Sequence, residues 1–580
     1  MYTKIVDKEG QVRAEYLDYG TRCHQKLGNK KEAVEFAITW CTEFITKKSV
    51  ERMGEVITWS NLNSHEPILD FACQQAIDRN LYSENLTAII QNQRYFGFHW
   101  KPSKLNESNL LSTLQLLQDD KLFLWMLKQG PITNISIILF LNTIIRLILE
   151  RANPNLQNFI DLEPIIEAIA AQCSENDYLF EKNDQDTVNL QILQDLFLSS
   201  TLNANDGRIC LWIIAMFMPI NDISDPETLS ALPHIKTQLK NPLVLKSFDF
   251  IQTEQKIVDQ LTTNTPLLNG DFEQMYLDYP YPKWKELDNI VRNTYQILKF
   301  FGHKDEDLRK KGLDILIAGC GTGKHAIEVA IANPDATVVA YDVSPRALAY
   351  AIRKQKALNI QNLRIELNDI EHFSASGVQF DIIECVGVLQ HTQDIWHSFD
   401  QLTRNLKPQG YMRIGIYSLA ARIVDSAFRL KLWDQGHLKS GSASEVRTIW
   451  NLIAQAIDDH TGMPDRLLSN DILTENRKQI LEHKSDAHFY HFEEVKLFKD
   501  FYNLHTFADM ICARNEHVSS IPEIAEALQA RQMKFIGMEH SNVEGKVDPK
   551  AYRSFKKLEK LEEKDFRSFA NMYTFWCHRE

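Results

Sequence analysis

Apolar and polar residues in the first 268 positions follow the spacing of helices. Apolar side chains recur every three or four residues, the pattern of a helix with one buried face. The windows are Ala33–Ile45, Ile68–Ile77, Leu122–Met126, Ile135–Leu149, Ile165–Ala171, Leu190–Leu198 and Arg208–Phe217. No fixed-period repeat holds along this region, so helical repeats would be present only in degenerate form. The pattern predicts an all-helical N-terminal domain, residues 1–268, that serves as a scaffold or recognises a substrate.

The pattern changes after a turn-rich stretch at residues 264–271. From there, short apolar runs alternate with helical segments, which predicts a parallel, doubly wound sheet. The expected strands are Leu313–Ala318, Thr337–Tyr341, Leu363–Leu367, Phe380–Val386 and Tyr411–Tyr417. The expected helices between them are Lys324–Ala332, Pro345–Leu358 and Ile395–Leu406. We therefore predict a Rossmann-like α/β domain over residues 269–580.

This alternation stops after Tyr417 and resumes about a hundred residues later. Helical segments at Ala443–Asp458 and Ile472–His483 fill the interval, followed by a helix at Ile521–Ala530 and strands at Lys534–Glu539 and Met572–Cys577. The result is a seven-stranded, mostly parallel sheet with a helical insertion at about 418–520. Open α/β sheets bind ligands at the carboxyl ends of their strands. The insertion is therefore expected to form a lid and a substrate wall.

Composition narrows the class of protein. The net charge of −13 disfavours a general grip on nucleic acid, because phosphate repels an acidic chain. The nine cysteines include no CxxC pair, which argues against a disulfide framework or a metal site and for a reducing compartment. No apolar window reads as a membrane span or a signal peptide. We expect a cytoplasmic protein, although delivery into another cell would leave no signal in these patterns.

The strongest chemical signal is a glycine turn between the first expected strand and helix, at Gly319, Gly321 and Gly323. Glycines let the backbone approach a ligand closely, and a following helix offers free N–H groups. Dinucleotide folds favour Gly-x-Gly-x-x-Gly, but here Lys324 stands at the third glycine position. Gly-x-Gly-x-Gly is instead the form seen where the turn holds the methionine end of S-adenosylmethionine (SAM).

Three positions at the ends of later strands extend this cofactor prediction. Asp342 follows the second strand, where a carboxylate can accept both ribose hydroxyls; alternatively, it caps the next helix with Ser344. Asp369 and Ile370 follow the third strand and are expected at the adenine, or else form a simple turn. Val386 ends the fourth strand, under the methionine part of the ligand.

The glycine turn, Asp342, Phe380–His391 and Leu406–Gly410 together resemble the class I SAM-dependent methyltransferases of the type 11/12 group. Further segments resemble bacterial methyltransferases with helical or tetratricopeptide-like N-termini. These segments are Gln172–Phe180, Tyr279–Trp284, Asp500–Asn503 through Glu516–His517, Ile521–Ile524 and Met572–Cys577. The resemblance implies SAM as the cofactor and a methyl acceptor that these motifs do not identify.

Candidate residues for the acceptor side follow from position. His391 lies just past the fourth strand and is either a general base or a rim histidine. His517, with Glu516 beside it, lies near the end of the insertion and is either a second catalytic group or an exposed turn. Tyr281 and Trp284 precede the first strand and either cover the cofactor or pack against the sheet edge.

Three functions remain open from these residues. The first is a methyltransferase that acts on a protein side chain or on a small metabolite. The second is a nicotinamide-dependent oxidoreductase, which Lys324 and the order of elements disfavour. The third is an interaction protein that binds SAM without catalysis, which the intact Gly319, Gly321 and Asp342 disfavour.

Overall fold

The computed structural model describes two compact units. It covers parts of residues 21–56, then 67–78, 90–91, 105–224 except 154 and 200, 228–229, 232, 253–263, parts of 280–300, 312–371, 379–458 with gaps in 421–435, 499–539 except 514 and 515, and 551–579 with gaps in 565–571. The first unit comprises Met1–Phe248, Trp450–Gly462 and Glu493–Leu504, and the second Asp249–Ile449, Met463–Phe492 and His505–Glu580. The expected boundary at 268 and the expected helix Ile472–His483 lie outside the described residues.

Every element described in the first 248 residues is helical. The α-helices are α2 (Lys30–Glu43), α4 (Pro67–Asp78), α6 (Leu110–Asp119), α7 (Lys121–Leu127), α8 (Ile135–Ala152), α9 (Glu163–Glu175), α10 (Asp184–Leu198) and α11 (Ala204–Ile214). Short 3-10 turns lie at η2 (Leu156–Leu162) and η3 (Ile220–Asp222). Five of the seven expected windows lie within an α-helix; Arg208–Phe217 continues three residues past the end of α11, and the last two residues of Ala33–Ile45 lie outside the described residues.

Helix α8 illustrates why these segments are helical. The Asn134 side chain accepts the Ile137 N–H at 3.1 Å and caps the first turn. Ile137, Ile144 and Ile148 share one face and are fully buried. Each such side chain stabilises the fold by about 1.5–3 kcal/mol relative to exposure in water. The Asn134 cap and the buried apolar face therefore both favour the helix at α8.

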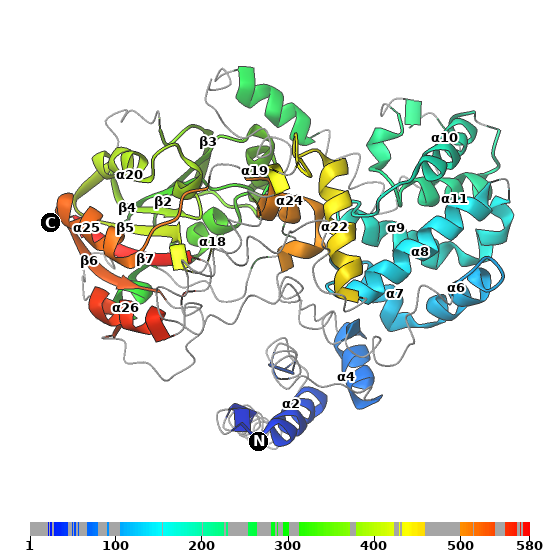
Figure 1. The fold of residues 1–580 in the computed structure, drawn as a ribbon, viewed down its shortest axis with the longest axis horizontal. Helices are drawn as coiled ribbons and strands as arrows, with labels where there is room; N and C mark the ends of the chain where they lie inside the picture. Colours follow the sequence, from blue (N-terminus) through cyan, green and yellow to red (C-terminus); the bar gives the residue numbers. More distant parts are fainter. Residues whose placement is uncertain are drawn as a thin grey trace, which may run out of the picture. The chain divides into compact units, whose positions relative to one another are not determined.

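The second unit contains a seven-stranded sheet in the order β3-β2-β1-β4-β5-β7-β6 (Figure 1). The strands are β1 (Asp314–Ala318), β2 (Thr337–Asp342), β3 (Leu363–Leu367), β4 (Phe380–Val386), β5 (Leu406–Tyr417), β6 (Met533–Met538) and β7 (Met572–Arg579). Strands β1 to β5 pair in parallel, and β7 runs antiparallel to both β5 and β6. The predicted fold class is confirmed.

Helices connect and flank these strands. They are α16 (Thr294–Phe300), α18 (Lys324–Ala332), α19 (Pro345–Ala357), α20 (Ile395–Arg404), α22 (Ala443–Asp458), α24 (Leu504–Cys512), α25 (Ile521–Ala530) and α26 (Phe555–Lys564). Short 3-10 turns lie at η4 (Leu389–His391), η6 (Lys499–Tyr502) and η7 (Ala551–Arg553). Two parts of the expected insertion, Trp450–Gly462 and Glu493–Leu504, group with the helical unit.

The fifth strand begins earlier than the sequence indicates. The helix expected at Ile395–Leu406 ends at Arg404, and Leu406 already pairs with Phe380 of β4. The chain then bulges, with Gln409 at a φ of 64°, before Tyr411 pairs with Ile382. Pro408 lacks an N–H for the ladder, so the pattern favours a turn there, whereas the bulge lets the strand continue.

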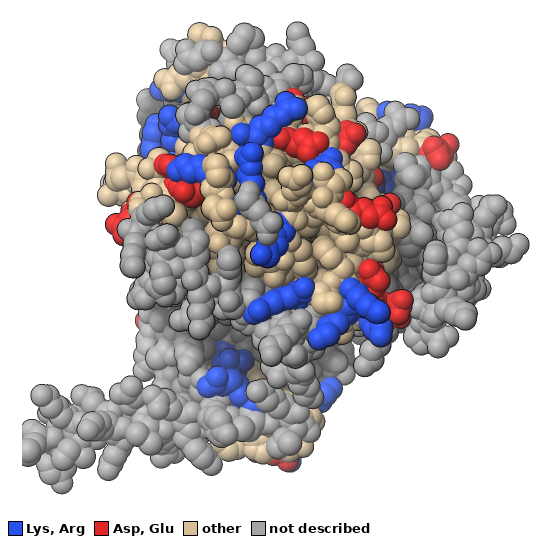
Figure 2. Space-filling model, turned by 90° about the vertical axis from the view of Figure 1, so that its left-hand side faces the viewer, with Lys and Arg blue, Asp and Glu red and all other residues tan. Residues whose placement is uncertain are grey.

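Surface and composition add little chemistry of their own. No helix among the described residues is long and apolar enough to cross a membrane. The described part of the chain holds no cluster of three or more metal-ligating side chains. On the face shown in Figure 2, Lys and Arg side chains lie together with Asp and Glu, so charges of both signs are exposed there.

Candidate methyl-transfer site

The glycine turn connects β1 to α18 in left-handed conformations. Gly319, Gly321 and Gly323 have φ values of 71°, 52° and 81°. The Gly319 and Cys320 N–H groups both donate to the Tyr341 carbonyl of β2, at 2.8 and 3.0 Å. The turn is thus fixed to the neighbouring strand before the first turn of α18 begins. A helix that starts directly after such a turn favours a polar or anionic ligand group.

A segment that precedes the sheet closes against this turn. We call residues 280–282 and 284 the strap. The Tyr281 carbonyl accepts the Thr322 N–H at 3.1 Å, and the Thr322 hydroxyl donates to the Pro282 carbonyl. A Cβ atom on Gly321 would lie only 2.3 Å from the Tyr281 carbonyl oxygen. Close approach of the strap, as well as positive φ, therefore requires glycine at this position.

Trp284 supports the turn through its buried ring. Its indole N–H donates to the Thr322 carbonyl at 3.2 Å. The ring packs edge-on against Tyr350 of α19, with centroids 5.9 Å apart, and the Lys354 ammonium lies 4.6 Å from the Trp284 ring. Tyr281 acts on the turn through its backbone. Direct contacts of Tyr281 and Trp284 with SAM stay predictions.

Asp342 lies at the end of β2, against the turn. Its carboxylate accepts the Gly321 N–H at 2.8 Å and the Ser344 N–H at 2.9 Å. Burial raises the pKa of Asp342, and the N–H donors of Ser344 and Gly321 partly offset this rise. Asp342 thus also has the alternative role that the sequence suggests, because it accepts a hydrogen bond from Ser344, the N-cap residue of α19. Because each carboxylate oxygen accepts more than one hydrogen bond, ribose binding is compatible with these contacts.

The remaining predicted cofactor residues lie at the ends of β3 and β4. Asp369 and Ile370 are buried, and the Asp369 carboxylate accepts the Glu371 N–H at 2.9 Å. Val386 ends β4, and a Cβ on the neighbouring Gly415 would lie 2.8 Å from its Cγ1. Because β3, β2, β1 and β4 are parallel neighbours, the ends of β3 and β4 lie at the same edge of the sheet as the glycine turn. Their contacts with adenine and methionine stay predictions.

His391 lies on the acceptor side, in η4, just past β4. Its ring meets the Tyr417 ring edge-on, with centroids 5.8 Å apart. Burial lowers the pKa of His391 to about 4; Glu516 opposes the shift, and Arg422 and Arg429 add to it. The imidazole is therefore neutral near pH 7. In that state it accepts a proton only weakly but still offers a hydrogen bond.

Glu516 is held by two arginines. Arg422 donates to both carboxylate oxygens, at 3.0 and 2.7 Å, and Arg429 donates to one of them at 2.7 Å. Only 1% of the Glu516 side chain is exposed. Burial would raise the pKa of Glu516, but Arg422 and Arg429 together lower it. The carboxylate is a buried anchor whose hydrogen bonds go to Arg422 and Arg429.

Backbone hydrogen bonds bring the returning insertion to the sheet edge. The His517 N–H donates to the Gln390 carbonyl at 2.8 Å. The Ser519 N–H donates to the Tyr417 carbonyl at 2.9 Å, and Ser418 and Ser519 form an isolated parallel bridge. The chain at His517 thus lies beside the turn that carries His391. The exposed His517 side chain stays a candidate on this rim.

We call His391, Tyr417, Arg422, Arg429, Glu516 and His517 the acceptor wall. The sequence analysis does not predict Tyr417, Arg422 or Arg429 as site residues. Tyr417 ends β5, and the Arg422 guanidinium lies 4.0 Å from the centroid of its ring. Arg429 is almost fully buried. The rule that ligands lie at the carboxyl ends of parallel strands could have identified Tyr417. The seven-residue spacing of Arg422 and Arg429 is a weaker signal.

An ionic network around the buried Glu384 side chain, also absent from the sequence prediction, links β4 to β5 and α18. Glu384 of β4 contacts the His325 ring at 2.8 Å and Arg413 of β5 at 3.2 Å, and Arg413 binds Glu539 at 2.7 Å. Burial would raise the pKa of Glu384, but His325 and Arg413 lower it to about 2. His325 belongs to the first turn of α18, so the network fixes the helix that follows the glycine turn. The sequence signal for this network is a single charged residue in each of two apolar strands, Glu384 in β4 and Arg413 in β5.

Comparison with known proteins finds similarity to methyltransferases in part of the chain. Residues 309–483 match a family model described as a methyltransferase domain. An uncharacterised protein of Synechococcus sp. is 34% identical over 110 residues, which are 19% of this chain and 26% of that protein. Trans-aconitate 2-methyltransferase of Deinococcus radiodurans is 34% identical over 98 residues, 17% of this chain and 35% of that enzyme. The chain thus spans about a quarter to a third of these relatives.

A solved structure, PKMT2 of Rickettsia typhi, is similar at a TM-score of 0.35 and 16% identity, covering 52% of this chain and 55% of that one. The matched segment contains the glycine turn, Asp342 and strands β1 to β5 of this sheet.

Proposed function

We propose that the protein transfers the methyl group of SAM to an acceptor that is a protein side chain. The observation that carries this proposal is the carboxyl edge of the sheet, where the glycine turn and Asp342 lie on one side and His391 and Tyr417 on the other. Gly319, Gly321 and Asp342 would hold the cofactor there. When bound, SAM would supply an electrophilic methyl group on a sulfonium; a lone pair of the acceptor would attack it, S-adenosylhomocysteine would leave, and the proton of the acceptor atom would pass to solvent.

The donor side is suited to a methionine carboxylate and a ribose. Left-handed glycines turn the backbone of residues 319–323 inward, and a side chain at Gly319 would overlap Val388, 2.4 Å away. The Asp342 carboxylate offers acceptor capacity beside this turn. These features support SAM rather than a dinucleotide, because Lys324 stands where the dinucleotide motif has its third glycine, which lets the helix pack closely on the strand.

The acceptor side favours positioning over strong base catalysis. Methyl transfer requires the nucleophile and the methyl group to be close and aligned. A histidine with a pKa of about 4 is a weak base, but it can orient an acceptor by a hydrogen bond. The wall of Tyr417, Arg422 and Glu516 is fixed by short contacts, as such orientation requires.

A protein acceptor is favoured over a metabolite by the size of the recognition surface. The first unit contributes a large helical body in addition to the methyltransferase domain. A small metabolite needs only the wall of the catalytic domain, whereas a protein needs an extended contact area.

Transfer of a labelled methyl group tests the proposal. Purified protein and SAM with a labelled methyl group are added to cell lysate, which is then separated into protein, nucleic-acid and small-molecule fractions. We expect label in the protein fraction, and a His391→Ala variant should incorporate about 10- to 100-fold less. Label in the small-molecule fraction alone would move the acceptor to metabolites. SAM binding without transfer to any fraction would contradict catalysis.

A further inference from the structure

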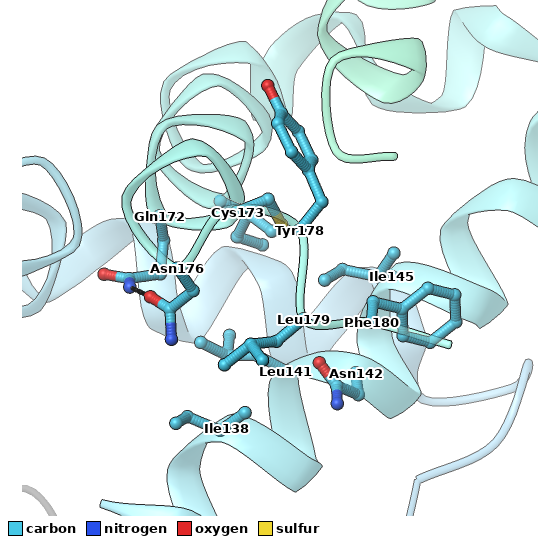
Figure 3. Close-up of a pocket in the computed structure, with 11 residues that line it drawn as sticks. Ile138, Leu141, Asn142, Ile145, Gln172, Cys173, Asn176, Tyr178, Leu179 and Phe180 are labelled. Atoms are coloured by element: carbon cyan, nitrogen blue, oxygen red, sulfur yellow. Dashed lines mark hydrogen bonds between the residues drawn. The ribbon is translucent and has the colours of Figure 1, made fainter. Parts of the chain in front are cut away.

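A pocket in the helical unit has no part in the proposed methyl transfer (Figure 3). It lies between α8, the end of α9 and the chain that follows α9, so all of it belongs to the first unit. One side is built by Gln172–Phe180, a segment that the proposed function leaves unexplained. With its open mouth the pocket encloses about 370 Å³, at the small end of the range of about 300–1,000 Å³ for ligand sites. Its size therefore suits a small ligand.

Aliphatic side chains form the wall that α8 contributes. Ile138, Leu141 and Ile145 line the pocket and are 4%, 3% and 2% exposed. Their spacing of three and four residues places them on one face of the helix. Ile169 of α9 and Leu179 add two further buried side chains. A ligand here would gain free energy mainly by removing apolar surface from water.

The chain after α9 reverses through two left-handed residues that are not glycine. Asp177 and Tyr178 have φ values of 51° and 60°. The Tyr178 N–H donates to the Cys173 carbonyl at 2.8 Å and closes the end of the helix. The reversal brings Leu179 and Phe180 to the pocket, on the side of α8 (Figure 3). Non-glycine residues keep such conformations only where the surroundings enforce them, and they gather at functional positions.

Three carboxamides line the pocket, and they differ in how they are satisfied. Those of Gln172 and Asn176 are hydrogen-bonded to each other, and Figure 3 shows the Asn142 carboxamide apart from this pair. Among the described residues, the Asn142 carboxamide has no hydrogen-bond partner. Asn142 shares the face of Ile138 and Ile145, where an apolar side chain would complete the wall. Its oxygen and its N–H groups are therefore available to a ligand.

The pocket presents no charge to a ligand. None of the described residues that line it is Asp, Glu, Lys or Arg. Burial raises the pKa of the Cys173 thiol to about 12 and also raises the pKa of Tyr178, so both groups are uncharged near pH 7. The Arg146 guanidinium, 5.0 Å from the centroid of the Phe180 ring, is paired with Asp186 at 3.2 Å. An ionic ligand would lose its water here without gaining an opposite charge.

We propose that this pocket binds a small neutral ligand that combines a short aliphatic chain with an amide group. The aliphatic chain packs against Ile138, Leu141 and Ile145. The amide pairs with the Asn142 carboxamide, because each of the two groups offers both a donor and an acceptor. The site lies wholly within the first unit, so the inference depends neither on methyl transfer nor on the SAM site.

Titration of isovaleramide into the full chain tests the proposal. The protein is labelled at the isoleucine δ1 methyl groups, and isoleucine-to-valine variants assign the signals of Ile138, Ile145 and Ile169. We expect these signals to shift together and to saturate with a Kd in the millimolar range, as a very small ligand allows. Isovalerate has the same chain but carries a carboxylate at pH 7, and it should bind about tenfold more weakly or worse.

Asn142→Leu separates ligand binding from packing. Leucine has the branched shape of asparagine without its polar atoms, so the midpoint of thermal unfolding should not fall. The Kd of isovaleramide should rise about three- to tenfold, because its amide loses a hydrogen-bonding partner. Asn189→Leu in α10 is the matched control. The Asn189 side-chain oxygen accepts from Gln185 at 3.1 Å outside the pocket, so this variant should keep the wild-type Kd.

Three results would overturn the proposal. Isovaleramide would shift none of the lining methyl signals, isovalerate would bind as tightly as isovaleramide, or Asn142→Leu would keep the wild-type Kd. A lower unfolding midpoint in Asn142→Leu with an unchanged Kd would assign Asn142 to packing alone. None of these measurements requires SAM or turnover, so their failure is distinguishable from a failure of the proposed methyl transfer.

Discussion

The donor and acceptor sides of the candidate site differ in how the chain builds them. The donor side is local: three glycines within five residues form the turn, and Asp342 follows one helix and one strand later. The acceptor side joins His391 and Tyr417 to Glu516, which lies about a hundred residues further along the chain. A local turn leaves a recognisable motif, whereas a wall assembled by tertiary contacts does not.

The largest expected effect is on the acceptor wall. Replacing Glu516 with alanine leaves the buried Arg422 and Arg429 side chains, which are 11% and 2% exposed, without the carboxylate that both bind. We expect a loss of about 3–5 kcal/mol in the free energy of unfolding, measured by urea denaturation. Asp400→Ala breaks the more exposed pair with Arg531 and should cost less than about 1 kcal/mol. Equal losses would show that the wall is not a buried anchor.

On the donor side, a substitution is expected to change SAM affinity rather than the free energy of unfolding. In Gly321→Ala, the new methyl group meets the Tyr281 carbonyl and the residue must keep a φ of 52°. We expect SAM binding to weaken by about 2–3 kcal/mol in calorimetry. Gly28→Ala carries a similar backbone penalty at a φ of 78° with no atom within 4 Å. It should not change SAM affinity. An equal loss in both variants would show that contact with the strap does not determine SAM binding.

The pH dependence of stability separates the two sides further. The pKa of His391 is lowered to about 4 in the folded state, so the unfolded chain binds more protons between about pH 6.5 and pH 4. His391 therefore contributes stability above this window that is lost as pH falls through it. Chemical denaturation at pH 7 and pH 5 should show a smaller pH dependence in His391→Gln than in the wild type. A wild-type slope retained in the variant would contradict the lowered pKa.

Much of the fold is predictable because it depends on local periodicity. The strands β1 to β4 begin and end within a residue or so of the expected runs, since parallel strands buried on both faces read as continuous apolar segments. The start of β5 is wrong by five residues, because Pro408 suggests a break that the bulge accommodates. Periodicity alone cannot detect a bulge.

Side-chain partners are less predictable. Glu516 was expected beside His517 by sequence adjacency, yet its carboxylate turns to arginines 94 and 87 positions away. The sequence predicts that Trp284 covers the cofactor or packs against the sheet edge, whereas its ring packs against Tyr350 of α19 and lies near Lys354. The partner that each side chain contacts depends on tertiary packing, so the spacing of residues within one segment cannot predict it.

The central claim is that the glycine turn and Asp342 form a SAM site, and calorimetry tests it most directly. SAM, S-adenosylhomocysteine and NAD are titrated in turn into the wild type and into Asp342→Ala. We predict micromolar binding of SAM and S-adenosylhomocysteine, no binding of NAD, and a loss of roughly 1–3 kcal/mol in SAM affinity in the variant. Tight binding of NAD alone, or a SAM affinity unchanged in Asp342→Ala, would contradict the claim.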